Sequence, residues 1–286
     1  MLRFSLVLLV PTLCLGTHAS DDLRHVLRED KSQSTGPRED RAENARRVLD
    51  GIVASAGENH RLPLRDTPGA RPPFRRNGDE LTVYYVRAGA AAARRLPEKE
   101  AATAFLLALG IALDDSSMLR TNVLTRGLWR KIEPDDARKK RLAVLGEPTL
   151  HGRHDLAQHF SVSAALTALA GPQAAERAGI LKEQLDSDGG SGFSFADLSA
   201  DFAGITFARR LLDKPNLLAD IEKSFRIDEY AIPPRGLPEG LTAKEFAEKY
   251  GSLKDERYLR VQEDIRKRIA ALPGYSDKNR TAEPRR

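Results

Sequence analysis

The sequence predicts a mainly α-helical protein, with a single helical domain over residues 80–272 behind a signal peptide and a charged leader. Apolar residues recur three and four positions apart in long segments, which is the spacing of one helix face. Residues that begin or end helices, such as Pro97, Ser194 and Pro273, stand at the limits of these segments. The core helices are expected over residues 97–113, 118–131, 155–170, 174–186 and 195–212.

Residues 1–19 have the pattern of a secretory signal peptide. Arg3 precedes a short apolar run, and the small residues Thr17 and Ala19 stand before an expected cleavage site at Ser20. The apolar run is too short for a mature membrane helix, so no transmembrane span is expected after cleavage. The sequence therefore predicts a periplasmic or secreted protein.

Cys14 is the only cysteine in the chain. Leu13 precedes it where a lipoprotein signal has a small residue, which disfavours lipidation without deciding it. Cleavage at Ser20 leaves no cysteine, so disulfide scaffolds, cysteine-ligated metal sites and thiol catalysis are excluded. The net charge is +5 with basic and acidic residues interspersed, so nucleic acid is not an expected partner.

Residues 20–79 are charged and rich in proline, and they are expected to form a mobile leader. One weak helix is predicted within it, over residues 40–56, with Ala45, Val48, Leu49 and Ile52 as its apolar stripe. The remaining residues offer too little apolar surface to offset the entropy of ordering them.

Residues 81–87 are β-branched and aromatic, which is typical of a strand. A lone strand has no partner, so this segment either pairs with another one or forms an extended or helical start. Farther along, Asp114 and Asp115 are expected to cap a helix, although adjacent carboxylates can also hold a divalent cation. The charged run over residues 135–141 predicts a solvated helix face.

The C-terminal part is predicted to hold two further helices. Thr242 and Glu245 form a capping box that begins the first, and residues 255–272 have the apolar spacing of the second. Pro273 ends that helix, and residues 273–286 are expected to be a disordered tail.

The densest polar chemistry lies between residues 154 and 201. Three pairs of side chains stand three or four positions apart, so each pair shares one helix face. These pairs are Asp155 with His159, Glu183 with Asp186, and Asp197 with Asp201. Between the second and third pairs, a turn is predicted from Gly189, Gly190, Ser191 and Gly192, with Ser194 and Asp197 capping the next helix.

The short turn folds two of these helices against each other, so the polar side chains are expected to converge. His159, Glu183 and Asp186 are the candidate catalytic residues. The other members expected in the cluster are Asp155, Gln158, Lys182 and Asp201. The sequence requires no cofactor and assigns no metal ligand. The one bound species that the cluster suggests is a divalent cation.

The segment 154–208 carries the pattern Asp-x-x-x-His-Phe, then Lys-Glu-x-x-Asp-Ser, then Gly-Ser-Gly-aromatic-Ser-aromatic-x-Asp-Leu-x-x-Asp-x-x-Gly. This pattern resembles the YfiM family of small bacterial envelope proteins, a family without an established activity. It is more loosely similar to VanZ-like proteins. Leu156 departs from the YfiM pattern, in which a lysine commonly follows the first aspartate. The resemblance implies a place in the cell envelope.

Three functions remain open from the sequence. The first is a structural or interaction module of the envelope, with envelope components as partners and an undetermined oligomeric state. The second is a hydrolase or transferase acting on envelope lipid or glycan, with His159 as general base and Glu183 or Asp186 orienting it or binding metal. The third is a cation-binding module that uses Asp186, Asp188 and the glycine loop, although Gly190 and Ser191 reverse the order of an EF-hand loop.

Overall fold

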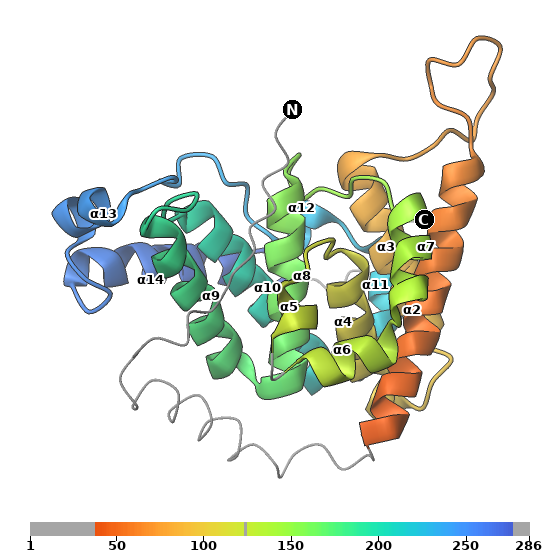
Figure 1. Cartoon of the computed structure of the whole chain (residues 1–286), viewed down its shortest axis with the longest axis horizontal. Coiled ribbons are helices and arrows are strands. Elements are labelled where there is room, and N and C mark those ends of the chain that lie inside the picture. Colours follow the sequence, from red (N-terminus) through yellow and green to blue (C-terminus); the bar gives the residue numbers. More distant parts are fainter. Residues whose placement is uncertain (1–37, 123–124, 277–286) are drawn as a thin grey trace.

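The computed structural model describes residues 38–122 and 125–276, and these residues form a helical protein (Figure 1). No strand occurs in these two ranges, where only isolated bridges such as that between Phe193 and Leu241 are found. The α-helices are α2 (Arg38–Arg61), α3 (Gly78–Ala93), α4 (Glu98–Ala112), α5 (Met118–Thr121), α6 (Arg126–Ile132), α7 (Asp135–Val144), α8 (His154–Ala170), α9 (Pro172–Ser187), α10 (Phe195–Asp213), α11 (Leu218–Ser224), α12 (Ile227–Tyr230), α13 (Ala243–Tyr250) and α14 (Glu256–Ala270).

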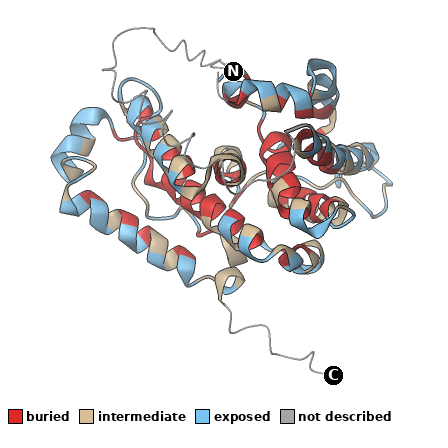
Figure 2. Cartoon of the chain, turned by 90° about the horizontal axis from the view of Figure 1, so that it is seen from below, coloured by how far each residue is buried: buried red, intermediate tan, exposed pale blue. Residues whose placement is uncertain are grey.

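Helix α8 is the centre of the fold and packs against α4, α9 and α10 (Figure 1). Its closest approach is to α10, where a Cβ added to Gly204 would lie 2.1 Å from the carbonyl oxygen of Phe160. Gly110 of α4 meets Ala165 of α8 in the same way, at 2.4 Å. Small residues therefore let three helix backbones approach closely. Buried residues gather on the inner sides of the helices, and exposed residues lie on their outer sides (Figure 2).

Helix α2 belongs to the packed domain, which corrects the expectation of a mobile leader over residues 38–77. The predicted apolar stripe is present, since Ala45, Val48, Leu49 and Ile52 are buried against α3 and α4. The loop that follows is held by Asn59, whose side chain accepts from the N–H of Arg76 at 2.8 Å and donates to its carbonyl at 3.1 Å. The expected signal peptide and the leader up to residue 37 lie outside the described residues.

The strand suggested for residues 81–87 does not form, because this segment is the first half of α3. Leu81, Tyr85 and Val86 are buried. Leu81 and Tyr85 are four positions apart, which is the spacing of one helix face, whereas a strand with one buried face would bury only every second residue and would expose Val86. The Tyr85 hydroxyl donates to the carbonyl of Leu145 at 2.7 Å. The alanines that follow favour a helix and extend it to Ala93.

The region between α4 and α8 differs from its prediction in three ways. The single helix expected over residues 118–131 is split into α5 and α6. The charged run of α7 is mostly solvated, but Arg138 is half-buried and donates to the carbonyls of Asp115 and Ser116. The Arg141 side chain is 1 % exposed and is bonded to the equally buried Glu133. The capping role expected of Asp114 and Asp115 is wrong, because the N-cap of α5 is Ser117; Asp114 instead accepts from the N–H of Ser116 at 2.8 Å in the loop before it.

The C-terminal helices form as predicted, with the capping box of Thr242 and Glu245 at the start of α13. Residues 273–276 pack on the domain, which corrects the expectation of disorder there. The Tyr275 hydroxyl donates to the carbonyl oxygens of Tyr230 at 2.8 Å and Ala203 at 3.1 Å. Residues 277–286 of the expected tail lie outside the described residues.

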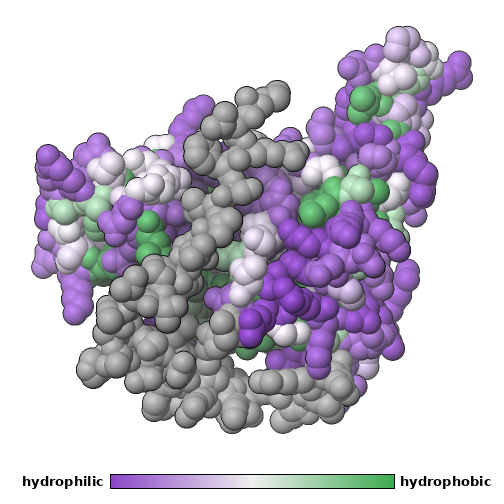
Figure 3. All heavy atoms as spheres, viewed as in Figure 1, coloured by the Kyte–Doolittle hydropathy of each residue, from purple (hydrophilic) through white to green (hydrophobic). Residues whose placement is uncertain are grey.

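On the face seen in Figure 3, the coloured residues are mostly hydrophilic, with separate small hydrophobic areas. Within the ranges 38–122 and 125–276, no helix has the length and the apolar character needed to cross a membrane.

Candidate functional site

A cluster of charged side chains lies where α8, α9 and α10 meet, and we call it the three-helix cluster. It draws one residue from α8, three from α9 and two from α10. Arg153, which directly precedes α8, lies at its edge. The six central members are His159, Lys182, Glu183, Asp186, Asp197 and Asp201.

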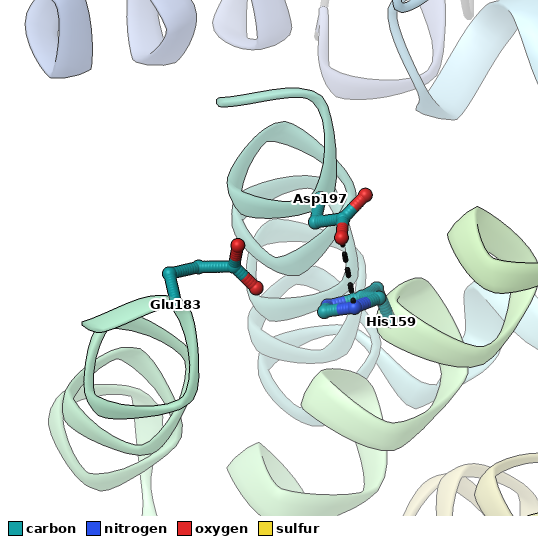
Figure 4. Close-up of side chains that lie close together, drawn as sticks. All are labelled: His159, Glu183 and Asp197. Carbon is teal, nitrogen blue, oxygen red and sulfur yellow. Dashed lines mark ion pairs between the residues drawn. The ribbon is translucent and has the colours of Figure 1, made fainter. Parts of the chain in front are cut away.

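His159 joins α8 to α10 and is only 9 % exposed. Its Nδ1 donates to Asp201 Oδ1 at 3.1 Å, and the same oxygen accepts from the Ser163 hydroxyl at 2.6 Å. Its Nε2 lies 3.5 Å from Asp197 Oδ2 (Figure 4). Burial lowers the pKa of His159, but the charge and hydrogen bond of Asp201 outweigh it and raise the pKa to about 9.

Glu183 joins α9 to the beginning of α10, and its side chain is fully buried. One carboxylate oxygen accepts from the N–H of Ser194 at 2.9 Å, and the other lies 3.3 Å from Lys182 Nζ. Burial raises the pKa of Glu183 to about 7, although the charges of Lys182 and His159 oppose this shift. The Lys182 ammonium also donates to Asp186 at 2.8 Å.

The glycine-rich turn between α9 and α10 is present as predicted. The N–H groups of Gly190 and Gly192 donate to the carbonyl oxygen of Asp186 at 2.9 and 3.0 Å. Gly192 has φ +88°, and a Cβ there would lie 2.3 Å from the backbone of Gly240. Only glycine fits this position, which brings the segment before α13 against the turn.

Asp197 has a larger role than the helix cap predicted for it. The expected cap is formed, because Ser194 Oγ accepts from the N–H of Asp197 at 3.1 Å. The Asp197 carboxylate, however, points into the cluster, toward His159 (Figure 4). It also lies 3.2 Å from the Arg153 guanidinium. Burial raises the pKa of this carboxyl, against the lowering effect of His159.

Arg153 is a member of the site that the sequence did not single out. It follows a tight turn in which His151 and Gly152 have φ values of +52° and +77°, a pair of positive angles typical of a type I′ turn. Its guanidinium bridges Asp197, Glu239 and Asp155, the last at 2.6 Å. No spacing rule predicts the direction of such a side chain.

Two predicted members lie away from the centre. Asp155 is paired with Arg153 at the rim, with 49 % of its side chain exposed. Gln158 donates to Asp115 on another side of α8, where His154 also lies 3.4 Å from Asp115, so its placement in the cluster is wrong. Gln158 directly precedes His159, and neighbouring side chains on a helix point about 100° apart, so the two residues lie on different sides of α8.

The donor atoms of His159, Glu183 and Asp197 lie within 4.8 Å of one another, an arrangement that can hold a metal ion. The glycine loop is less suitable, because Asp188 is exposed at the end of α9 and the Asp186 carboxylate is bonded to Lys182. A set of one imidazole and two carboxylates can bind a divalent cation or exchange protons.

Comparisons with known proteins add no assignment to this geometry. No family model matches the chain, and no curated protein or solved structure matches it. The resemblance of residues 154–208 to the YfiM family therefore stays a prediction.

Proposed function

We propose that the chain is an exported helical module of the bacterial cell envelope, in which the three-helix cluster has a structural role. The signal-peptide pattern of residues 1–19 supports export. The resemblance of residues 154–208 to a family of envelope proteins supports the location. The cluster fixes the relative positions of α8, α9 and α10 and so presents one defined surface to envelope partners.

The bonding of Glu183 is the observation that carries this proposal. A fully buried carboxylate is tolerated only where hydrogen bonds and opposite charge replace its water. Glu183 has both, since it accepts from the N–H of Ser194 and lies beside the Lys182 ammonium. The carboxylate thereby ties the last turn of α9 to the beginning of α10.

The cluster specifies one packing of the helices better than apolar side chains would. A shift of α8 by one turn would break the present bonds of His159 and Ser163 to Asp201. Breaking a buried ion pair is strongly unfavourable, so the cluster favours the observed register. Apolar residues, by contrast, can exchange neighbours at little expense.

Replacing Glu183 by alanine is expected to lower the free energy of unfolding by about 1–3 kcal/mol, because Lys182 and the Ser194 N–H lose their buried partner. Urea unfolding of the full chain, in buffer with a metal chelator, measures the change. Glu248→Ala is the matched control, since Glu248 lies on α13 with 63 % of its side chain exposed. The control is expected to change stability by less than about 1 kcal/mol.

A Glu183→Ala variant that is as stable as the wild type, or more stable, would contradict the structural role of the three-helix cluster. Groups kept for catalysis or ligand binding often lower stability, so their removal raises it. The enzymatic alternative, with His159 as general base, would then become the better explanation.

A further inference from the structure

The three-helix cluster contains an arrangement that goes beyond a structural network. We infer that His159 Nε2, Glu183 and Asp197 bind a single divalent transition-metal ion, of which zinc is the representative case. The three ligands come from α8, α9 and α10, so one ion would join all three helices (Figure 4).

The spacing of the donor atoms fits such an ion. Zinc bonds to imidazole nitrogen and carboxylate oxygen are about 2.0–2.2 Å long, so two ligand atoms of a tetrahedral site lie about 3.4 Å apart. His159 Nε2 and Asp197 Oδ2 are 3.5 Å apart. The donor atoms of all three residues lie within 4.8 Å, so Glu183 needs only a small side-chain movement to complete the set.

The other side of the His159 ring points to the same conclusion. Its Nδ1 donates to Asp201, which the Ser163 hydroxyl holds in turn. Metal-binding histidines usually have this kind of carboxylate partner, which fixes the ring and directs the remaining nitrogen at the ion. Nε2 is that remaining nitrogen, and it lies 3.5 Å from the Asp197 carboxylate.

The charges of the cluster also favour a dication. Four carboxylates at most 11 % exposed, those of Glu183, Asp186, Asp197 and Asp201, face two cations, Lys182 and Arg153. With these four carboxylates ionised, and without Asp155 and Glu239, which pair with Arg153 at the rim, the net charge of this set is 2 − 4 = −2. A divalent ion would bring this charge to zero.

The ligand types select the class of metal. Imidazole favours zinc and other first-row transition metals, while magnesium and calcium favour sites made of oxygen ligands alone. Three protein ligands leave a fourth tetrahedral position for water or another small ligand. The proposed structural role does not depend on the ion, because the ion pairs already close the cluster without it.

Thermal unfolding of the full chain tests the inference after removal of metal with a chelator. Zinc chloride at one equivalent and above is expected to raise Tm by several degrees and to saturate at one ion per chain, because the ion binds the folded state. Cobalt(II) chloride is expected to give visible absorption bands of a four-coordinate ion in the same 1:1 ratio. No saturable Tm shift and no cobalt band with wild-type protein would overturn the inference.

Variants locate the site. His159→Gln and Asp197→Asn are expected to abolish the zinc-dependent shift, whereas the exposed Asp136→Asn and the neighbouring His154→Gln retain it. A shift that survives His159→Gln and disappears in His154→Gln would overturn the assignment. The proposed structural role is tested separately, by the stability of Glu183→Ala without metal, so each claim can fail while the other stands.

Discussion

Replacing Glu133 by alanine is expected to lower the free energy of unfolding by about 3–5 kcal/mol, because it leaves two buried arginines without their shared carboxylate. Glu133 accepts from Arg141 Nε at 2.6 Å and Nη2 at 3.2 Å, and from Arg120 Nη1 at 3.4 Å. The side chains of Glu133 and Arg141 are each 1 % exposed, and that of Arg120 is 7 % exposed. Water cannot replace the lost partner at this depth.

Urea unfolding measures this loss, with Glu80→Ala as the control. Glu80 also pairs with an arginine, Arg65 at 3.1 Å, but 58 % of its side chain is exposed. Its removal is expected to change stability by less than about 1 kcal/mol. Equal effects of the two substitutions would show that the Glu133 site is open to solvent and would contradict the packing of α5, α6 and α7 described above.

Replacing Gly204 by alanine is expected to destabilise the chain by about 3 kcal/mol or more, because it forces α8 and α10 apart. The added Cβ would lie 2.1 Å from the Phe160 carbonyl oxygen and 2.9 Å from its carbon, both atoms of a helix backbone that cannot rotate away. The shift would also pull Asp201 from His159, one turn away on the same pair of helices.

Gly127→Ala is the matched control for this substitution. Gly127 lies in α6, and a Cβ there would have no atom within 4 Å. Alanine is the better helix former, so this variant is expected to be as stable as the wild type or more stable by up to about 1 kcal/mol. Thermal unfolding of both variants is sufficient, and a neutral Gly204→Ala would show that α8 and α10 are not in backbone contact.

The helical fold was predictable because its core helices have regular apolar spacing and clear capping residues. Helix α10 begins at Phe195, directly after the capping Ser194, and α13 begins after Thr242. The strand-like residues of α3 were ambiguous, because β-branched and aromatic side chains also suit a buried helix. The contribution of α2 to the core was underestimated, because the many charged residues of this helix indicate exposure. Val48 and Ile52 on its apolar face are nevertheless completely buried.

The centre of the site was also predictable in part. Helical spacing brought Glu183 and Asp186 to one face, and the glycine turn brought α9 and α10 together. The inward direction of Asp197 was not predictable, because the same residue type at this position also serves as a cap. Arg153 follows a turn in which His151 has a positive φ angle, which is uncommon for a residue other than glycine and is not indicated by any spacing pattern.

Protonation of His159 links the cluster to stability. Its pKa in the folded chain is raised to about 9, above the ordinary value of 6.5. The stabilisation from the charged ring is therefore complete below pH 6.5 and is lost as the pH rises through about 9. The pKa of Glu183 is also raised, from 4.5 to about 7. The stabilisation from its protonated form is therefore complete below pH 4.5 and is lost as the pH rises through about 7.

The pKa of His159, measured by NMR titration of its ring protons in the metal-free chain, tests the three-helix cluster most directly. The signal is assigned by its loss in His159→Gln, which separates it from His154, whose pKa is also raised to about 9 by Asp115. The expected midpoint is about 9, falling toward 6.5 or below in Asp201→Asn. A midpoint at or below 6.5 in the wild type would contradict the account, because His159 would then be buried without its carboxylate partners.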